Sequence, residues 1–164
     1  VSVRMTLANY ETAMANAVRR ALRLGEHEAV PRISDLAALA ASTTGKLELE
    51  YAGSDRSEAE VLEELRKRAA RIVFEEVAAG EGLAPVVEAF DQGWQVEVSD
   101  RMPSSEYLEG LDEIPGLRDG AERLAGSDSP ARLASAIEFI LEGLHLQNRL
   151  NKTERDGSLR YSQG

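Results

Sequence analysis

Residues 127–151 read SDSPARLASAIEFILEGLHLQNRLN, and this stretch decides the fold class. Its apolar side chains recur every three or four residues, which is the spacing of one face of an α-helix. They are Leu133, Ile137, Ile140, Leu141 and Leu144. Ser127 or Ser129 can cap the start of the helix, and Pro130 suits its first turn. The stretch therefore predicts a long final helix with one face in the core.

The clearest helical pattern upstream of this stretch covers residues 58–78. Ser57 and Glu60 form a capping box in SEAE, in which the two side chains satisfy backbone N–H groups of the first turn. The apolar residues of this helix also recur at helical spacing and are predicted to face the core. They are Val61, Leu65, Ala69, Ile72, Val73 and Val77.

A further long helix is expected to begin at Ser2 or Thr6 and to end at Gly25. Its spacing places Arg20 off the apolar face, which is predicted to consist of Leu7, Met14, Val18, Ala21 and Leu22. Shorter helices are predicted at residues 35–42, 83–92, 106–111 and 114–126.

Short segments of the chain alternate apolar and polar side chains, as half-buried strands do. Residues 94–99 (WQVEVS) show this best, and residues 157–162 (GSLRYS) are expected to pair with them. Residues 46–51 (KLELEY) fit either a strand or an extended connector. The prediction is a mainly α fold: a helical bundle followed by a helical C-terminal extension with room for two short β-strands.

The composition of the 164-residue chain excludes several classes of function. The net charge of −10 disfavours nucleic-acid binding, which needs Lys and Arg to neutralise phosphates. The absence of cysteine excludes disulfides and thiolate metal sites, and no apolar run approaches the roughly 18 residues of a membrane helix. A cytoplasmic protein is therefore expected.

The charge is unevenly distributed along the chain. Residues 1–79 carry a net charge of −2 and residues 80–164 carry −8. The Gly-rich stretch AAGEGLAP (residues 78–85) lies at this change, and such stretches often connect structural units. We therefore predict two units, a helical domain at residues 1–79 and an acidic helical extension at residues 80–164.

The most familiar catalytic and ligand-binding patterns are incomplete in this sequence. STTGKLELE contains a Gly-Lys pair at Lys46, but a Walker A phosphate-binding loop needs glycine where Ala40 stands and Ser or Thr where Leu47 stands. His27 and His145 lie far apart and lack the spacing of a metal site. We therefore expect no catalytic residue and no metal site within these residues.

Two other features have a structural explanation beside a functional one. Ser104 and Ser105 open a predicted helix, where an anion could bind, although simple capping explains both serines. Phe90 and Trp94 lie on either side of a helix-to-strand turn and are expected to pack in the core.

Arg4 differs from these candidates because its position works against stability. It lies in the first turn of the first predicted helix, where the helix dipole repels a cation. A guanidinium at this place can instead donate two parallel hydrogen bonds to a phosphate. Arg4 is therefore the candidate phosphate-binding residue of the chain.

A family resemblance is carried by residues 2–39, SVRMTLANYETAMANAVRRALRLGEHEAVPRISDLAAL. This segment closely resembles part of the bacterial AAA+ ATPases related to magnesium chelatase subunit I. In that family a helical lid follows the ATPase core, and one lid helix begins with a Ser-x-Arg motif, which Ser2 and Arg4 match. Residues 45–50 (GKLELE) are also similar to the chelatase-like subgroup, and the resemblance is vaguer after residue 80.

The resemblance implies that Arg4 is the sensor 2 arginine, which contacts the γ-phosphate of ATP and couples hydrolysis to lid movement. It also implies that the Walker A, Walker B, sensor 1 and arginine-finger elements lie upstream of Val1. The chain would then be the lid and tail of a longer ATPase and inactive alone. ATP and Mg²⁺ would be cofactors of the full-length protein. That protein would form a homo-oligomeric ring, a hexamer, with an adhesion-type-domain partner subunit in metal insertion or protein remodelling.

The residues by themselves leave a second class of function open. The chain could be a stand-alone helical interaction module that has no nucleotide role and binds a basic partner through its acidic surface. An enzyme acting on a small molecule or a metal ion has the least support, because no constellation of residues favours it.

Overall fold

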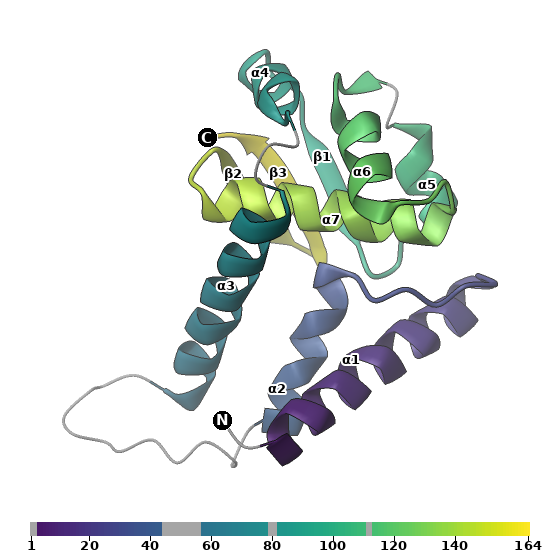
Figure 1. The fold of residues 1–164 in the computed structure, drawn as a ribbon, viewed down its shortest axis with the longest axis vertical. Coiled ribbons are helices and arrows are strands. Elements are labelled where there is room, and N and C mark those ends of the chain that lie inside the picture. Colours follow the sequence, from purple (N-terminus) through teal and green to yellow (C-terminus); the bar gives the residue numbers. More distant parts are fainter. Residues whose placement is uncertain (1–2, 44–56, 79–81, 111–112) are drawn as a thin grey trace.

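The computed structural model describes residues 3–43, 57–78, 82–110 and 113–164 (Figure 1). This part of the chain is mainly helical with a small sheet, which confirms the predicted fold class. The elements in chain order are α1 (Val3–Leu24), the 3-10 helix η1 (Ile33–Ala38), α2 (Leu39–Thr43), α3 (Glu58–Val77), α4 (Ala84–Asp91), β1 (Val96–Ser99), α5 (Ser104–Glu109), α6 (Leu117–Ala125), α7 (Pro130–Leu146), β2 (Leu150–Arg155) and β3 (Ser158–Gln163).

Helix α7 forms the centre of the core. Its buried residues lie on nearly every side of the helix, and it contacts η1, α3, α5, α6 and β2 (Figure 1). A helix with apolar residues on nearly all sides is stable only when other elements surround it. Residues 127–151 therefore supply the helix on which η1, α3, α5, α6 and β2 pack.

Helix α7 ends earlier than the pattern of apolar residues suggested. The prediction carried the helix to residue 151, whereas it ends at Leu146 and strand β2 begins at Leu150. Asn148 lies between them in a left-handed backbone conformation with φ of 59°, which asparagine adopts more readily than most residues. Leu150, which the prediction placed in the helix, is buried as the first residue of strand β2.

The three strands form one antiparallel sheet with the order β1-β3-β2. The predicted pairing of residues 94–99 with 157–162 is confirmed, since β1 pairs with β3 with Val96 opposite Tyr161. Strand β2 was not predicted. It joins β3 through a hairpin in which Asp156 and Gly157 have φ values of 53° and 82°, a turn that the Asp-Gly pair favours.

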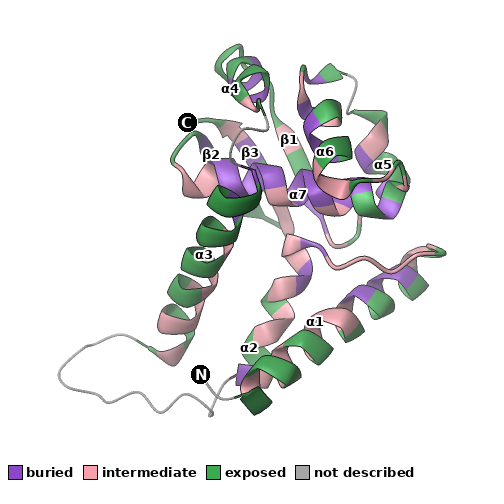
Figure 2. Cartoon of the chain, in the orientation of Figure 1, coloured by how far each residue is buried: buried purple, intermediate pink, exposed green. Residues whose placement is uncertain are grey.

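Helix α3 has the predicted cap, but it does not bury the predicted stripe. The capping box of Ser57 and Glu60 is formed. Within the described part of the chain, Phe74 is the only buried residue of α3 itself, and most of the helix is exposed (Figure 2). The predicted core residues that are instead 46–48% exposed are Leu65, Ile72, Val73 and Val77.

Helix α1 packs only in part with the side that was predicted. Ala21 is buried, as predicted, but so are Ala17 and Arg20, and Arg20 was predicted to lie off the core face. The physical reason is polar, because the side of α1 that meets η1 bonds to it through side chains. The apolar side chains that α1 leaves exposed are Val3, Leu7, Tyr10, Val18 and Leu22.

Two further predictions concern the segment at residues 46–51 and the boundary at residue 79. The strand or connector at residues 46–51 lies outside the described residues. The division at residue 79 stays a prediction, although hydrogen bonds join its two sides, for example from the N–H of Ser34 to Glu138 at 2.8 Å. None of the described helices is long and apolar enough to cross a membrane.

Candidate functional site

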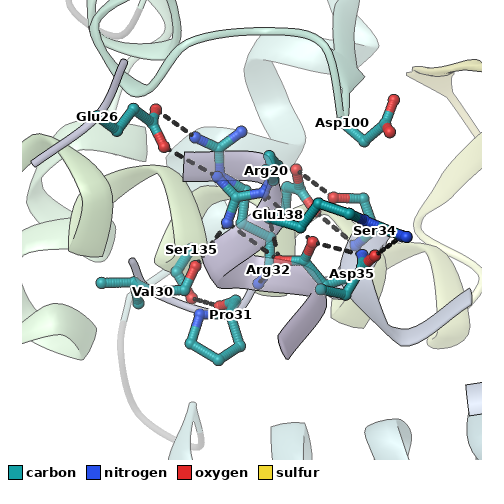
Figure 3. Close-up of polar contacts among 12 residues, drawn as sticks. Arg20, Glu26, Val30, Pro31, Arg32, Ser34, Asp35, Asp100, Ser135 and Glu138 are labelled. Carbon is teal, nitrogen blue, oxygen red and sulfur yellow. Dashed lines mark hydrogen bonds and ion pairs between the residues drawn. The ribbon is translucent and has the colours of Figure 1, made fainter. Parts of the chain in front are cut away.

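Four charged residues form a network that joins the end of α1 to η1 (Figure 3). This ion network consists of Arg20, Glu26, Arg32 and Asp35. The Nη2 atom of Arg20 donates to Asp35 at 3.0 Å and to the carbonyl of Val30 at 2.7 Å, and its Nη1 atom donates to Glu26 at 3.0 Å. Asp35 is fully buried and also accepts a hydrogen bond from Asn16 at 2.9 Å. The last turns of α1 are therefore fixed to η1 by charge.

Arg32 extends the ion network to α5. Its Nη2 atom donates to Glu26 at 3.1 Å and to the hydroxyl of Ser104 at 2.8 Å, and its Nη1 atom donates to the carbonyl of Met102 at 2.8 Å. The guanidinium also lies 4.6 Å from the ring centre of Tyr107, within the range of a cation–π contact. Arg32 thus links the loop after α1 to the start of α5.

The sequence suggested either a bound anion or a simple cap at the start of α5. The carboxylate of Glu26 lies there, beside Ser104. The N–H and the hydroxyl of Ser104 both donate to this carboxylate at 2.6 Å, so the anion is a side chain of the protein itself. Burial alone would raise the pKa of Glu26, but the hydrogen bonds from Ser104 and the charges of Arg32 and Arg20 together lower it. Gly25, at φ of 70°, ends α1 just before this residue.

A buried carboxylate of α7, Glu138, joins η1 to α5. It accepts the N–H of Ser34 at 2.8 Å, the hydroxyl of Ser34 at 3.1 Å and the hydroxyl of Tyr107 at 2.5 Å. Burial raises the pKa of Glu138 above its usual value, and the hydrogen bonds from Tyr107 and Ser34 offset only part of this rise. Burial and the neighbouring Glu138 also raise the pKa of Tyr107, which keeps its hydroxyl as a donor.

Glu142 lies one helical turn further along α7 and ties the sheet to the helix. Its carboxylate accepts hydrogen bonds from the Nζ of Lys152 at 2.7 Å and from the hydroxyl of Tyr161 at 2.8 Å. Burial alone would raise the pKa of Glu142, but the hydrogen bond and charge of Lys152, the hydrogen bond from Tyr161 and the charge of Arg66 together lower it. Two buried carboxylates on one helix therefore have pKa values shifted in opposite directions.

These opposite shifts predict opposite effects of pH on stability. The raised pKa of Glu138 gives a contribution that is full below the unfolded-state pKa and is lost as the pH rises through the folded-state pKa. The Glu138→Gln variant carries no charge and lacks this loss. Its free energy of unfolding, measured by urea titration and compared with wild type, is expected to increase as the pH rises from about 5 to about 8.

Glu142→Gln is the matched control on the same helix. The lowered pKa of Glu142 gives a contribution that is present above the unfolded-state pKa and lost as the pH falls through the folded-state pKa. Relative to wild type, the free energy of unfolding of this variant is expected to decrease as the pH rises from about 3 to about 6. Parallel pH dependences for the two variants would contradict both assignments.

The buried charges of the ion network hold α1, η1 and α5 together. Arg20, Arg32 and Asp35 are at most 3% exposed, whereas a catalytic acid or base must reach its substrate. The described residues contain no cluster of three or more His, Asp or Glu side chains that could hold a metal ion. The ion network links α1 to η1 and α5, and Glu138 links both η1 and α5 to α7.

The structure keeps the candidate phosphate-binding residue apart from the ion network. Arg4 is exposed in the first turn of α1, 16 residues before Arg20, which corresponds to about 24 Å along a helix. Lys46 lies outside the described residues. His27 is exposed, and His145 is half-buried with its Nδ1 atom 3.0 Å from the carbonyl of Leu150.

The aromatic pair at the helix-to-strand turn is divided between core and surface. Phe90 is fully buried, as predicted, whereas Trp94 is 36% exposed, so its predicted place in the core is wrong. Gly93, at φ of 100°, turns the chain between them. Phe90 belongs to α4, whereas Trp94 lies between α4 and β1.

The ion network itself was not predicted from the sequence. Its members lie on α1, in the following loop and on η1, so their contacts depend on the tertiary fold. Comparisons of the chain with family models, with curated proteins and with solved structures find no match.

Proposed function

We propose that the chain is the lid and C-terminal region of a chelatase-like AAA+ ATPase and couples ATP binding and hydrolysis to a conformational change. The observation that carries this proposal is that α1 has an exposed arginine, Arg4, in its first turn and a buried one, Arg20, near its end. The helix has 22 residues, which corresponds to a rod of about 33 Å. A rod fixed at one end can transmit a movement of the other end.

In this proposal Arg4 acts as the sensor 2 arginine. Its planar guanidinium donates hydrogen bonds to the γ-phosphate of ATP held by a core domain, and its exposure leaves it free to do so. These bonds depend on the γ-phosphate, so the position of Arg4 differs before and after hydrolysis. The ion network fixes Arg20 to η1 through Asp35 and links it to α5 through Glu26 and Arg32. A shift of α1 therefore displaces η1 and α5 as well.

The remaining parts of the proposal concern the full-length protein. ATP and Mg²⁺ are its cofactors, and the core domain is proposed to hold both of them. The full-length protein is proposed to form a cytoplasmic homo-oligomeric ring, a hexamer, and to work with an adhesion-type-domain partner subunit. Its work would be metal insertion or protein remodelling.

The first test is the encoded polypeptide upstream of Val1. The proposal requires Walker A and Walker B motifs there, and their absence would overturn it. The second test replaces Arg4 with alanine in that full-length protein. Losing a preorganised donor to the transferring phosphoryl group is expected to lower steady-state ATP turnover at least about tenfold.

Arg68→Ala is the matched control for this variant, because Arg68 is also an exposed helical arginine but lies on α3. Its ATP turnover is expected to stay within about twofold of wild type, since it makes no contact in the proposed mechanism. Nucleotide affinity is measured alongside turnover. If Arg4→Ala matches Arg68→Ala in both measurements, Arg4 is not a sensor.

A further inference from the structure

An apolar groove lies between α2 and α3, with a volume of 650 Å³. Along α3 its lining runs from Ala59 to Val73, and Phe139 of α7 also lines it. Helices α2 and α3 extend in the same direction from the body (Figure 1). The apolar side chains that line the groove include Met5, Leu36, Leu39, Leu62, Leu65 and Val73.

A second cavity, of 780 Å³, borders this groove and is polar. The two share part of their lining, including Ile33, Glu63 and Arg66, so they lie next to each other. Residues of α1, η1, α3, α7 and the three strands line the polar cavity. The cationic side chains that line it are Arg19, Arg66, Lys67 and Lys152.

The α1 and α3 sides of this polar cavity have cations with few carboxylate partners. Arg66 and Lys67 share the single carboxylate of Glu63, with N–O distances of 2.5 Å and 3.6 Å. Arg19 donates to the side chain of Asn16 and forms no ion pair with any residue in the described part of the chain. These two sides can therefore accept further negative charge from outside.

The carboxylates on the far side of the cavity do not remove this excess. Asp100 is paired with Arg23 at 3.1 Å, and Lys152 is paired with the buried Glu142. Glu154 is the remaining lining carboxylate. The lining charges and their partners therefore contain one more cation than carboxylate, in a chain whose net charge is −10. The net charge of the chain disfavours a nucleic acid as the partner, because its binding needs many Lys and Arg side chains.

We propose that the groove and the polar cavity together dock an acidic amphipathic helix of a partner protein. The apolar face of that helix occupies the groove, and its carboxylates face Arg19, Arg66 and Lys67. The lining from Ala59 to Val73 corresponds to about 21 Å, which fits a partner helix of about four turns with apolar residues at helical spacing. This inference goes beyond the proposed ATPase role and does not depend on it.

The groove also has the apolar surface that such a partner requires. Leu65 and Val73, both in its lining, are 48% and 46% exposed, and a partner helix would remove this area from water. Charge complementarity at Arg19 and Lys67 would then select an acidic helix over a basic one. The apolar groove supplies affinity and the polar cavity supplies specificity.

The first experiment measures binding of fluorescent synthetic helices to the whole chain by anisotropy. One 16-residue helix has Leu at every third or fourth position and Glu along one flank, a second has Lys in place of Glu, and a third has the Glu sequence scrambled. We expect the Glu helix to bind at least about tenfold more tightly than the other two and to weaken as salt is added.

The second experiment uses matched pairs of variants on α3. Val73→Glu places a charge in the groove, whereas Ile72→Glu places one at an equally exposed residue outside the lining. Lys67→Glu reverses a charge in the polar cavity, and Arg68→Glu reverses one that does not line it. Val73→Glu is expected to weaken binding of the Glu helix at least about tenfold, Lys67→Glu several-fold, and each control less than about twofold.

Three results would overturn the proposal. One is equal affinity for the Glu, Lys and scrambled helices, and another is equal loss within both matched pairs while circular dichroism shows all variants folded. The third is binding of vesicles of phosphatidylserine and phosphatidylcholine that depends on Val73 and Lys67 in the same way. That result would assign the surface to a membrane instead of a protein helix.

Discussion

Replacing Asp35 with alanine is expected to lower the free energy of unfolding by about 3–5 kcal/mol. Asp35 is fully buried and accepts hydrogen bonds from the guanidinium of Arg20, from the N–H of Arg32 and from Asn16. Removing one member of a buried ion pair leaves the other charge without compensation in a medium that solvates it poorly. Chemical denaturation of wild type and variant measures the loss.

The ion pair between Arg23 and Asp100 is the natural control, because it links the same helix to the body on the surface. Its N–O distance is 3.1 Å, and its side chains are 49% and 44% exposed. Asp100→Ala is expected to change the free energy of unfolding by less than about 1 kcal/mol. Equal losses for Asp35→Ala and Asp100→Ala would show that burial does not strengthen the ion network.

The elements that the sequence predicted well are those fixed by local chemistry. The capping box of Ser57 and Glu60 forms because its two residues are three positions apart and need no other part of the chain. The helical pattern of residues 130–146 and the alternation around Val96 and Tyr161 are likewise properties of short segments. Strand β2 was missed because Leu150 continues a helical spacing that Asn148 interrupts.

The packing of α1 and α3 could not be predicted in the same way. Periodicity identifies an apolar side of a helix, but it does not say what covers that side. In α1 the side that meets η1 is held by Asn16 and Arg20, while Leu7 and Leu22 stay exposed. The prediction for α1 assumed that charged residues such as Arg20 face water. This assumption fails wherever a buried partner is available.

The buried carboxylates of α7 did leave a signal in the sequence. Glu138 and Glu142 are the only charged residues between Leu133 and Leu144, and they lie one turn apart in a helix that is otherwise apolar on nearly every side. Such a helix must be surrounded, so its carboxylates need buried partners. The partners, Tyr107 and Lys152 among them, come from other elements, and sequence spacing does not identify them.

Replacing Phe74 with alanine is expected to lower the free energy of unfolding by about 3–5 kcal/mol. Phe74 is 3% exposed and is the only buried residue of α3 itself within the described part of the chain. Its ring meets that of Phe139 edge-on, with a centroid distance of 5.4 Å. Val77→Ala, at a residue of the same helix that is 48% exposed, is the control and is expected to lose less than about 1 kcal/mol.

The Phe74 ring packs directly against Gly143 of α7. The loss of stability in Phe74→Ala is therefore expected to arise at this contact and not along the whole of α3. A Cβ atom at Gly143 would lie 2.1 Å from the Phe74 ring, so Gly143→Ala alone is expected to destabilise the fold by about 1–3 kcal/mol. In the Phe74→Ala background the ring is absent. The same substitution should then be neutral or stabilise by up to about 1 kcal/mol through helix propensity. Additive effects in this double-mutant cycle would contradict the direct contact, whereas strong coupling would establish Phe74 and Gly143 as the anchor of α3.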